Sequence, residues 1–221
     1  MSQLDCTLEP VARLDGGNGM RVNGRRYMKI TIARKLALLL GILMTLAVTN
    51  SSAATGQWVD LFNGKDLTGW IPVHDVKPAV VDGCLQIHKG MGWLRLEKIY
   101  KDFILEFEWR AYDNDYDSGI YMRAPLDGKP WPDAGFQVNL RYNALGALVK
   151  NRKTIVPAET PKLPINKWHK MRIEVRGNKA KLIINGEDNW ETDLIDRPEG
   201  YIGIQIEDKK FDFRNIRIME L

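Results

Sequence analysis

FILEFEWR, at residues 103–110, carries the clearest signal of the fold class. Its apolar and charged side chains alternate, with Phe103, Leu105, Phe107 and Trp109 on one side and Glu106, Glu108 and Arg110 on the other. Successive side chains of a β-strand point to opposite faces, so this period of two predicts a half-buried strand. One face is expected to cover a core and the other to carry polar groups.

The same alternation recurs through the rest of the chain. It predicts further strands at 118–123, 135–142, 168–176, 179–185, 201–207 and 211–221, with weaker signals at 80–88 and 93–96. Gly177-Asn178 separates two of these segments and is typical of a tight hairpin turn. No window after residue 55 carries an amphipathic helix. Many short strands with frequent turns predict an all-β sandwich or barrel.

The excess of basic over acidic residues lies entirely in the N-terminal quarter of the chain. The 221 residues hold 32 Lys and Arg against 28 Asp and Glu, for a formal net charge of +4. The first 54 hold seven basic and three acidic residues, which leaves 25 of each in the remaining 167. A balanced domain gives no electrostatic reason to bind nucleic acid, so we expect no nucleic-acid partner.

The N-terminal quarter has the layout of a secretory signal. Arg34 and Lys35 precede the apolar run LALLLGILMTLAV at 36–48, and the small and polar residues TNSSAA follow it. We therefore predict a signal peptide over 28–54, cleaved after Ala54, and a periplasmic or extracellular protein. The run is shorter than the roughly 20 residues of a spanning helix, so no stable membrane span is expected after cleavage; an uncleaved anchor is the alternative. Residues 1–27 are interpreted as a spurious or disordered extension, and 55–221 as a single domain.

The second faces of the predicted strands carry the candidate ligand-binding residues. They combine guanidinium forks, amides, carboxylates and an aromatic ring, a set that suits a hydroxyl-rich ligand. The candidates are Glu106, Glu108, Arg110, Tyr121, Arg123, Gln137, Asn139, Arg141, Gln205 and Glu207. Trp131, in the loop DGKPWPDAG, is interpreted either as stacking on a sugar or as anchoring its loop to the core. A cross-strand ladder of salt bridges on an exposed sheet is the alternative interpretation of the same residues.

Four motifs in series carry a family resemblance: WVDLFNGKDLTGW (58–70), DFILEFEWR with DSGIYMRA (102–124), NKWHKMRIEVRG with LIING (166–186) and GYIGIQIEDKKFDFRNIRIMEL (200–221). In this order and spacing they resemble the 3-keto-disaccharide hydrolase family, also described as 3-keto-glycoside 1,2-lyases and hydratases. The resemblance spans residues 57–221. It implies a concanavalin- or LamG-like jelly-roll sandwich whose concave sheet binds the ligand, and a sugar or 3-keto-glycoside as partner.

The implied chemistry is elimination followed by hydration. A 3-keto group acidifies the proton on C2, so a base can remove it before the glycosidic oxygen leaves C1 and water adds back. Such a site needs a base, a donor to the enolate oxygen and an acid for the leaving oxygen. Glu108 and Arg123 match the family pattern and are assigned to catalysis together with Glu207, and Gln137, Asn139, Arg141, Gln205, Tyr121 and Trp131 are assigned to substrate binding.

Three positions depart from the family pattern. The family commonly has Glu, Gln and His where this chain has Gln137, Asn139 and Glu207. Glu207 then supplies the base in this member, or the chain is a carbohydrate-binding module without turnover; a structural envelope sandwich is a third interpretation. The histidines lack metal-site spacing, so no metal ligands are predicted and a divalent cation is left open as cofactor. Asp113, Asp115 and Asp117 look like either a calcium loop or a solvated acidic turn.

Overall fold

A computed structural model describes residues 56–158, 160 and 162–221 of the chain. All regular structure in these residues is β, in fifteen strands and without a helix. The predicted extension (1–27) and signal peptide (28–54) lie outside the described residues and stay predictions. In the described part of the chain, no helix is long and apolar enough to cross a membrane.

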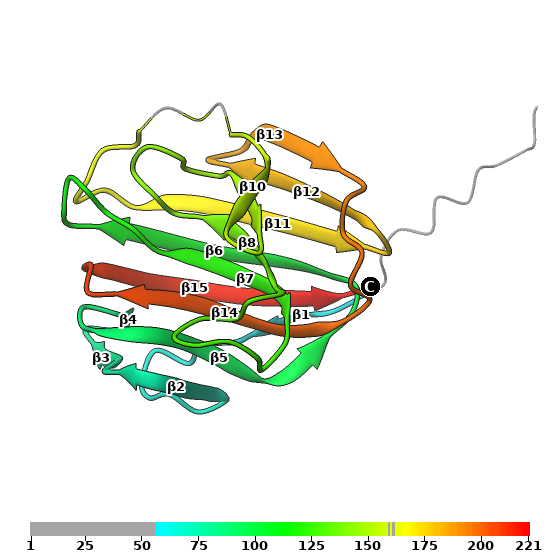
Figure 1. The fold of residues 1–221 in the computed structure, drawn as a ribbon. Coiled ribbons are helices and arrows are strands. Elements are labelled where there is room, and N and C mark those ends of the chain that lie inside the picture. Colours follow the sequence, from blue (N-terminus) through cyan, green and yellow to red (C-terminus); the bar gives the residue numbers. More distant parts are fainter. Residues whose placement is uncertain (1–55, 159, 161) are drawn as a thin grey trace, which may run out of the picture. The chain divides into compact units, whose positions relative to one another are not determined.

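The strands form two antiparallel sheets, which Figure 1 shows as two layers. The eight-stranded sheet has the order β13 (Glu187–Thr192), β12 (Lys179–Ile184), β11 (His169–Arg176), β6 (Phe103–Ala111), β15 (Phe211–Glu220), β4 (Cys84–Gln86) and β3 (Ala79–Val81), and β1 (Trp58–Asp60) also pairs with β15. The seven-stranded sheet has the order β10 (Lys153–Val156), β9 (Leu148–Lys150), β8 (Phe136–Asn139), β7 (Gly119–Ala124), β14 (Gly200–Glu207), β5 (Gly90–Tyr100) and β2 (Trp70–Val76).

The apolar faces of the two sheets form one core. Phe103, Leu105 and Phe107 of β6 are at most 2% exposed, and so are Phe136 and Val138 of β8. The alternation therefore predicted correctly which side chains face inward. The segment 80–88 is the least regular, because a turn at residues 82–83 divides it between the short strands β3 and β4.

The expectation that the outward polar residues of these strands form one ligand-binding face is wrong. β6 and β7 follow each other in the chain, but β6 pairs with β11 and β15 whereas β7 pairs with β8 and β14. Glu106, Glu108 and Arg110 consequently lie on the outer face of the eight-stranded sheet, and Tyr121 and the polar residues of β8 on that of the seven-stranded sheet. A period of two separates inside from outside, but both sheets of a sandwich have an outside.

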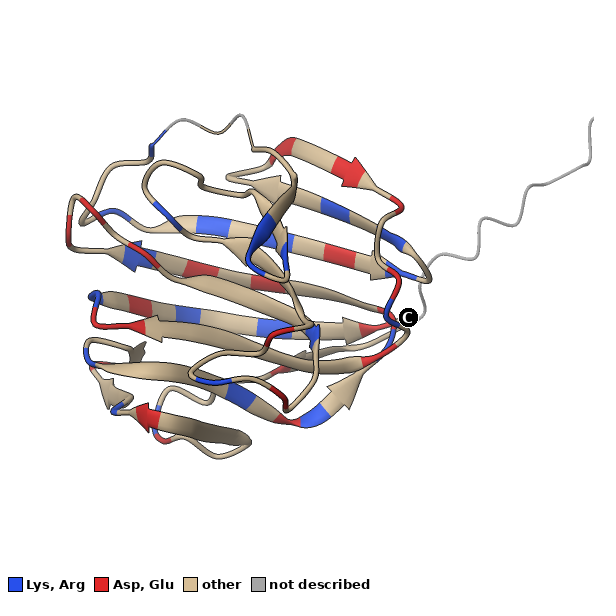
Figure 2. Cartoon of the chain, viewed as in Figure 1, with Lys and Arg blue, Asp and Glu red and all other residues tan. Residues whose placement is uncertain are grey.

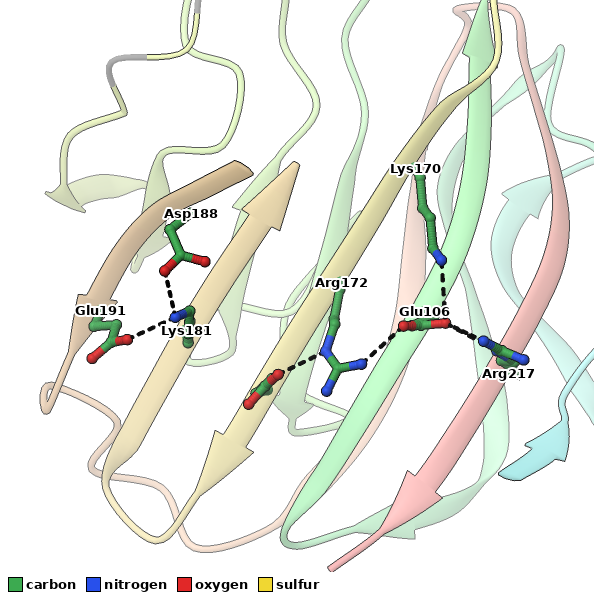
Figure 3. Close-up of polar contacts among 8 residues, drawn as sticks. Glu106, Lys170, Arg172, Lys181, Asp188, Glu191 and Arg217 are labelled. Atoms are coloured by element: carbon green, nitrogen blue, oxygen red, sulfur yellow. Dashed lines mark hydrogen bonds and ion pairs between the residues drawn. The ribbon is translucent and has the colours of Figure 1, made fainter. Parts of the chain in front are cut away.

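The outer face of the eight-stranded sheet carries a salt-bridge network (Figure 3). Glu106, only 6% exposed, accepts from Arg217 at 2.6 Å and Arg172 at 3.0 Å, with Lys170 at 3.7 Å. Burial by itself would raise the pKa of Glu106, but hydrogen bonds from Arg217 and Arg172 hold this pKa below its ordinary value. Figure 2 shows basic and acidic residues on the strands of this sheet, where Lys181 of β12 also pairs with Asp188 at 2.6 Å and with Glu191 at 3.0 Å in β13. For Glu106, Glu108 and Arg110, three of the ten candidates, the salt-bridge ladder is the arrangement observed.

A β-bulge in β15 makes this network possible. Residues three apart in a regular strand point to opposite faces. The pairing of β15 with β6 shifts between Arg214 and Arg217, where Asn215 has φ of 51°. Arg214 therefore reaches Glu108 at 2.7 Å while Arg217 reaches Glu106 on the same outer face. Glu108, predicted to be catalytic, therefore lies in a salt bridge on the eight-stranded sheet and not in a site on the other sheet.

Candidate functional site

A polar cleft of about 370 Å³ opens on the outer face of the seven-stranded sheet. It collects seven of the nine predicted site residues: Tyr121, Trp131, Gln137, Asn139, Arg141, Gln205 and Glu207. β7, β8 and β14 lie side by side in this sheet, so their outward side chains meet at its centre. The loops that follow β7 and β8 add Trp131 and Arg141. The cleft is the candidate site.

Three side chains form a hydrogen-bonded relay along the floor of the cleft. Gln137 donates its Nε2 to Oε1 of Gln205, and Gln205 donates its Nε2 to Oε2 of Glu207 at 2.6 Å. Gln205 is 6% exposed, so the middle of the relay is shielded from water. The amide groups therefore connect a residue of β8 to a carboxylate at the end of β14.

The pKa values of two carboxyl groups in the cleft, Glu207 and Asp117, are raised above their ordinary values. Burial raises the pKa of Glu207, and the neighbouring charge of Asp117 raises it further, against the opposing effects of Arg141 and the Gln205 hydrogen bond. Burial likewise raises the pKa of Asp117, which pairs with Nε of Arg141 at 3.2 Å. A carboxylate whose pKa is raised toward neutrality is a stronger base once it is ionised.

Aromatic rings line the cleft beside the relay. Tyr121 packs edge-on against Trp93, with ring centroids 5.7 Å apart, and Trp131 packs against the small cluster that these two rings form with Ala124. The indole Nε1 of Trp131 donates to the carbonyl of Ile206 at 3.3 Å, which ties the loop to β14. Burial raises the pKa of Tyr121, and the charge of Glu207 adds to this, so the phenol stays protonated at neutral pH. It can therefore donate a hydrogen bond.

The sequence reasoning missed two charged residues of the cleft. The sequence pattern indicates only a calcium loop or an acidic turn for Asp117, yet Asp117 lines the cleft with Arg141. Arg152 lies at the tip of the β9–β10 hairpin, where it and Asn151 have φ of 60° and 51°. These left-handed positions favour Asn and Gly, so an arginine there gives no recognisable turn signal. Arg152 also contacts Asp133 at 3.2 Å.

Arg123, the third predicted catalytic residue, does not line the cleft. It has φ of 46° and is 1% exposed. Its guanidinium bonds to Asp102 at 2.8 Å and to the carbonyls of Lys101, Gly177 and Arg197 at 2.6–2.7 Å. The structure places this side chain among loops that it ties together, and not beside Glu207.

The comparisons agree with this architecture. Residues 57–219 match the family of 3-keto-alpha-glucoside-1,2-lyase-like domains. The chain belongs to this family. The match covers nearly all of the described residues, and it confirms the resemblance stated from the sequence motifs. Among curated proteins, no sequence matches the chain.

Solved structures similar to this chain are jelly-roll sandwiches. A protein described as a putative glycosyl hydrolase from Parabacteroides distasonis superposes with a TM-score of 0.62 at 22% identity, over 79% of this chain and 98% of that one. The carbohydrate binding module CBM66 from Bacillus subtilis gives 0.59 at 20%, over 69% and 96%. A Bacillus subtilis protein with a galectin-like fold gives 0.60 at 14%, over 74% and 94%. At these identities the likeness shows the fold alone.

The cleft of this 3-keto-alpha-glucoside-1,2-lyase-like domain does not fit a dedicated divalent-metal site. Within residues 56–158, 160 and 162–221, no group of three or more His, Cys, Asp and Glu side chains could hold a metal ion. The three aspartates of the predicted acidic turn are each directed elsewhere: Asp113 accepts from the backbone of Lys210, Asp115 from Lys209, and Asp117 pairs with Arg141. These contacts fit an acidic turn in which Asp115 is exposed and Asp117 is half-buried in the cleft.

Proposed function

We propose that the polar cleft binds a 3-keto-glycoside and that Glu207 removes the proton on C2. The observation that carries this proposal is a half-buried carboxylate with a raised pKa in a cleft that also holds two guanidinium groups and a phenol. Family membership supplies the substrate class. The amides of Gln137 and Asn139 both donate and accept, which matches sugar hydroxyls.

The steps follow from these groups. Glu207 takes the C2 proton, and the electron pair moves onto the C3 carbonyl as an enolate, which Arg141 and Arg152 stabilise electrostatically. The C3 carbonyl re-forms and a C1–C2 double bond appears as the C1–O bond breaks, and Tyr121 gives its proton to the departing oxygen. Water then adds at C1 and passes a proton to the Tyr121 phenolate, while protonated Glu207 returns a proton to C2, so the net reaction is hydrolysis.

The direct test is release of glucose from 3-keto-trehalose by the purified protein, with and without added divalent cations. We expect glucose release by the wild-type protein and none from trehalose itself, because only the keto sugar has an acidified C2 proton. Absence of release with every cation added would reject the enzymatic function.

Sugar binding without turnover is the second candidate, and the amide-rich relay favours it. Gln137 and Asn139 are neutral groups that can hold hydroxyls but cannot act as bases. Binding of 3-keto-trehalose and of trehalose, measured by calorimetry, separates the two candidates. Tight binding of either sugar by a protein that releases no glucose would favour the binding module.

Trp131→Ala is expected to weaken sugar affinity about tenfold, because the ring lines the cleft and offers a flat apolar surface to a pyranose. The measurement is the dissociation constant of 3-keto-trehalose, or its KM. Leu126→Ala is the matched control, since Leu126 lies on the same loop with 58% of its surface exposed. Equal affinities for the two variants would remove Trp131 from the binding surface.

A further inference from the structure

We propose that Gln137 is a positioning residue that orients the Gln205 amide, so that an N–H of Gln205 is aimed at Glu207. This inference rests on the proposed function only where it concerns the reactivity of Glu207. Its structural part, the direction of the relay, stands on the contacts alone.

The carboxylate of Glu207 determines which way the amide of Gln205 is oriented. An ionised carboxylate only accepts hydrogen bonds, so Gln205 must present Nε2 to Glu207, where the distance is 2.6 Å. Its Oε1 then faces Gln137 and needs a donor. The amide of Gln137 supplies one. A glutamate at position 137 would present a second acceptor, and Gln205 has only one NH₂ group to share between two carboxylates.

The backbone around the relay leaves the amides little freedom. A Cβ on Gly119 would lie 2.2 Å from Nε2 of Gln137, so the missing side chain is what lets Gln137 extend across β7 toward Gln205. Ser118 Oγ donates to the carbonyl of Gln205 at 2.7 Å and holds β14 at this position. Since Gln205 is nearly inaccessible, water cannot replace a lost partner.

The relay engages one oxygen of Glu207 and leaves the other available to accept a proton from the substrate. Oε2 accepts from Gln205, whereas Oε1 has no hydrogen-bond donor among the described residues. The charged and titratable groups that act on Glu207 are Asp117, Arg141, Lys209 and Tyr121. Burial and Asp117 favour the protonated carboxyl, and the N–H of Gln205 opposes them. Reversing the Gln205 amide would remove this opposition and raise the pKa of Glu207 further.

The test is a double-mutant cycle with Gln137→Glu, Glu207→Gln and the combined swap, measured as urea midpoints at pH 7. Gln137→Glu places two acceptors on one amide and should lower the midpoint clearly. The swap restores a complete relay running in the opposite direction, so its midpoint should return to the level of Glu207→Gln. Gln57→Glu, at an exposed position, controls for the added charge. A Gln137→Glu midpoint equal to that of Gln57→Glu would overturn the proposal.

A second readout follows the carboxyl group itself. Carboxyl ¹³C titration should show the pKa of Glu207 moved upward by about one pH unit or more in Gln137→Glu. If the wild-type protein cleaves 3-keto-trehalose, the rise of its rate with pH should move by the same amount, and an unmoved titration would reject the relay. If the wild-type protein cleaves nothing, the proposed function fails, while the midpoints and the titration still decide the role of Gln137.

Discussion

Arg123→Ala is expected to destabilise the domain by about 3 kcal/mol without acting on the cleft directly. The substitution deletes a 1%-exposed guanidinium that satisfies three backbone carbonyls and the carboxylate of Asp102. Those acceptors belong to three separate loop segments, around residues 101–102, 177 and 197. Left unpaired, they lose their hydrogen bonds and the segments lose their common anchor. The measurement is the urea unfolding midpoint at neutral pH.

Two variants sharpen this test. Arg123→Lys keeps the charge but not the planar fork, so its unfolding midpoint should fall between those of wild type and Arg123→Ala. Arg176→Ala, at an exposed position, should unfold like the wild-type protein. A wild-type midpoint for Arg123→Ala, combined with a loss of sugar affinity, would instead return Arg123 to the binding machinery that its strand motif suggested.

Glu207→Gln is expected to reduce turnover of 3-keto-trehalose by roughly 10²–10⁴-fold, the usual contribution of a general base. Glutamine keeps the size of the side chain and can still accept from Gln205, so the cleft should retain its shape. Circular dichroism and sugar affinity should be close to those of wild type. Glu199→Gln, at an exposed position, is the matched control and should keep full activity. Full activity in Glu207→Gln would place the base elsewhere.

Because the pKa of Glu207 is raised, Glu207→Gln is expected to increase the stability of the domain while it reduces turnover. A carboxyl whose pKa is higher in the folded than in the unfolded chain favours folding while protonated, and this contribution is lost as the pH rises through the folded-state pKa. The ionised wild-type protein should therefore be less stable than Glu207→Gln at neutral pH, with the difference shrinking below the ordinary glutamate pKa. Thermal unfolding midpoints between pH 4 and 8 measure it.

The wild-type rate should depend on pH with the same sign. Only the ionised carboxylate accepts a proton, so kcat/KM is expected to rise with pH through a midpoint above the ordinary glutamate value. A midpoint at or below that ordinary value would contradict the assignment of Glu207 as the base. The measurement is glucose release from 3-keto-trehalose under first-order conditions.

Local pattern predicted the parts of the site that lie on regular strands. The alternation in β8 put Gln137 and Asn139 outside and Phe136 and Val138 inside, and the structure agrees. The same rule failed for Arg123, at the end of β7, because its positive φ ends the regular alternation and turns the side chain into the space between loops. Such a conformation depends on partners 21 to 74 residues away in sequence.

The pattern of residues along the chain was enough to predict an all-β sandwich, the side chains of its core and the family to which it belongs. Which polar faces meet depends on the pairing of distant strands. β6 and β7 carry similar outward residues, but long-range pairing with β15 and β14 sends them to opposite sheets. Glu108 thus became part of a salt-bridge network and Tyr121 part of a cleft. Alternation is a property of one strand, whereas a site is made by the neighbours that hydrogen bonding selects.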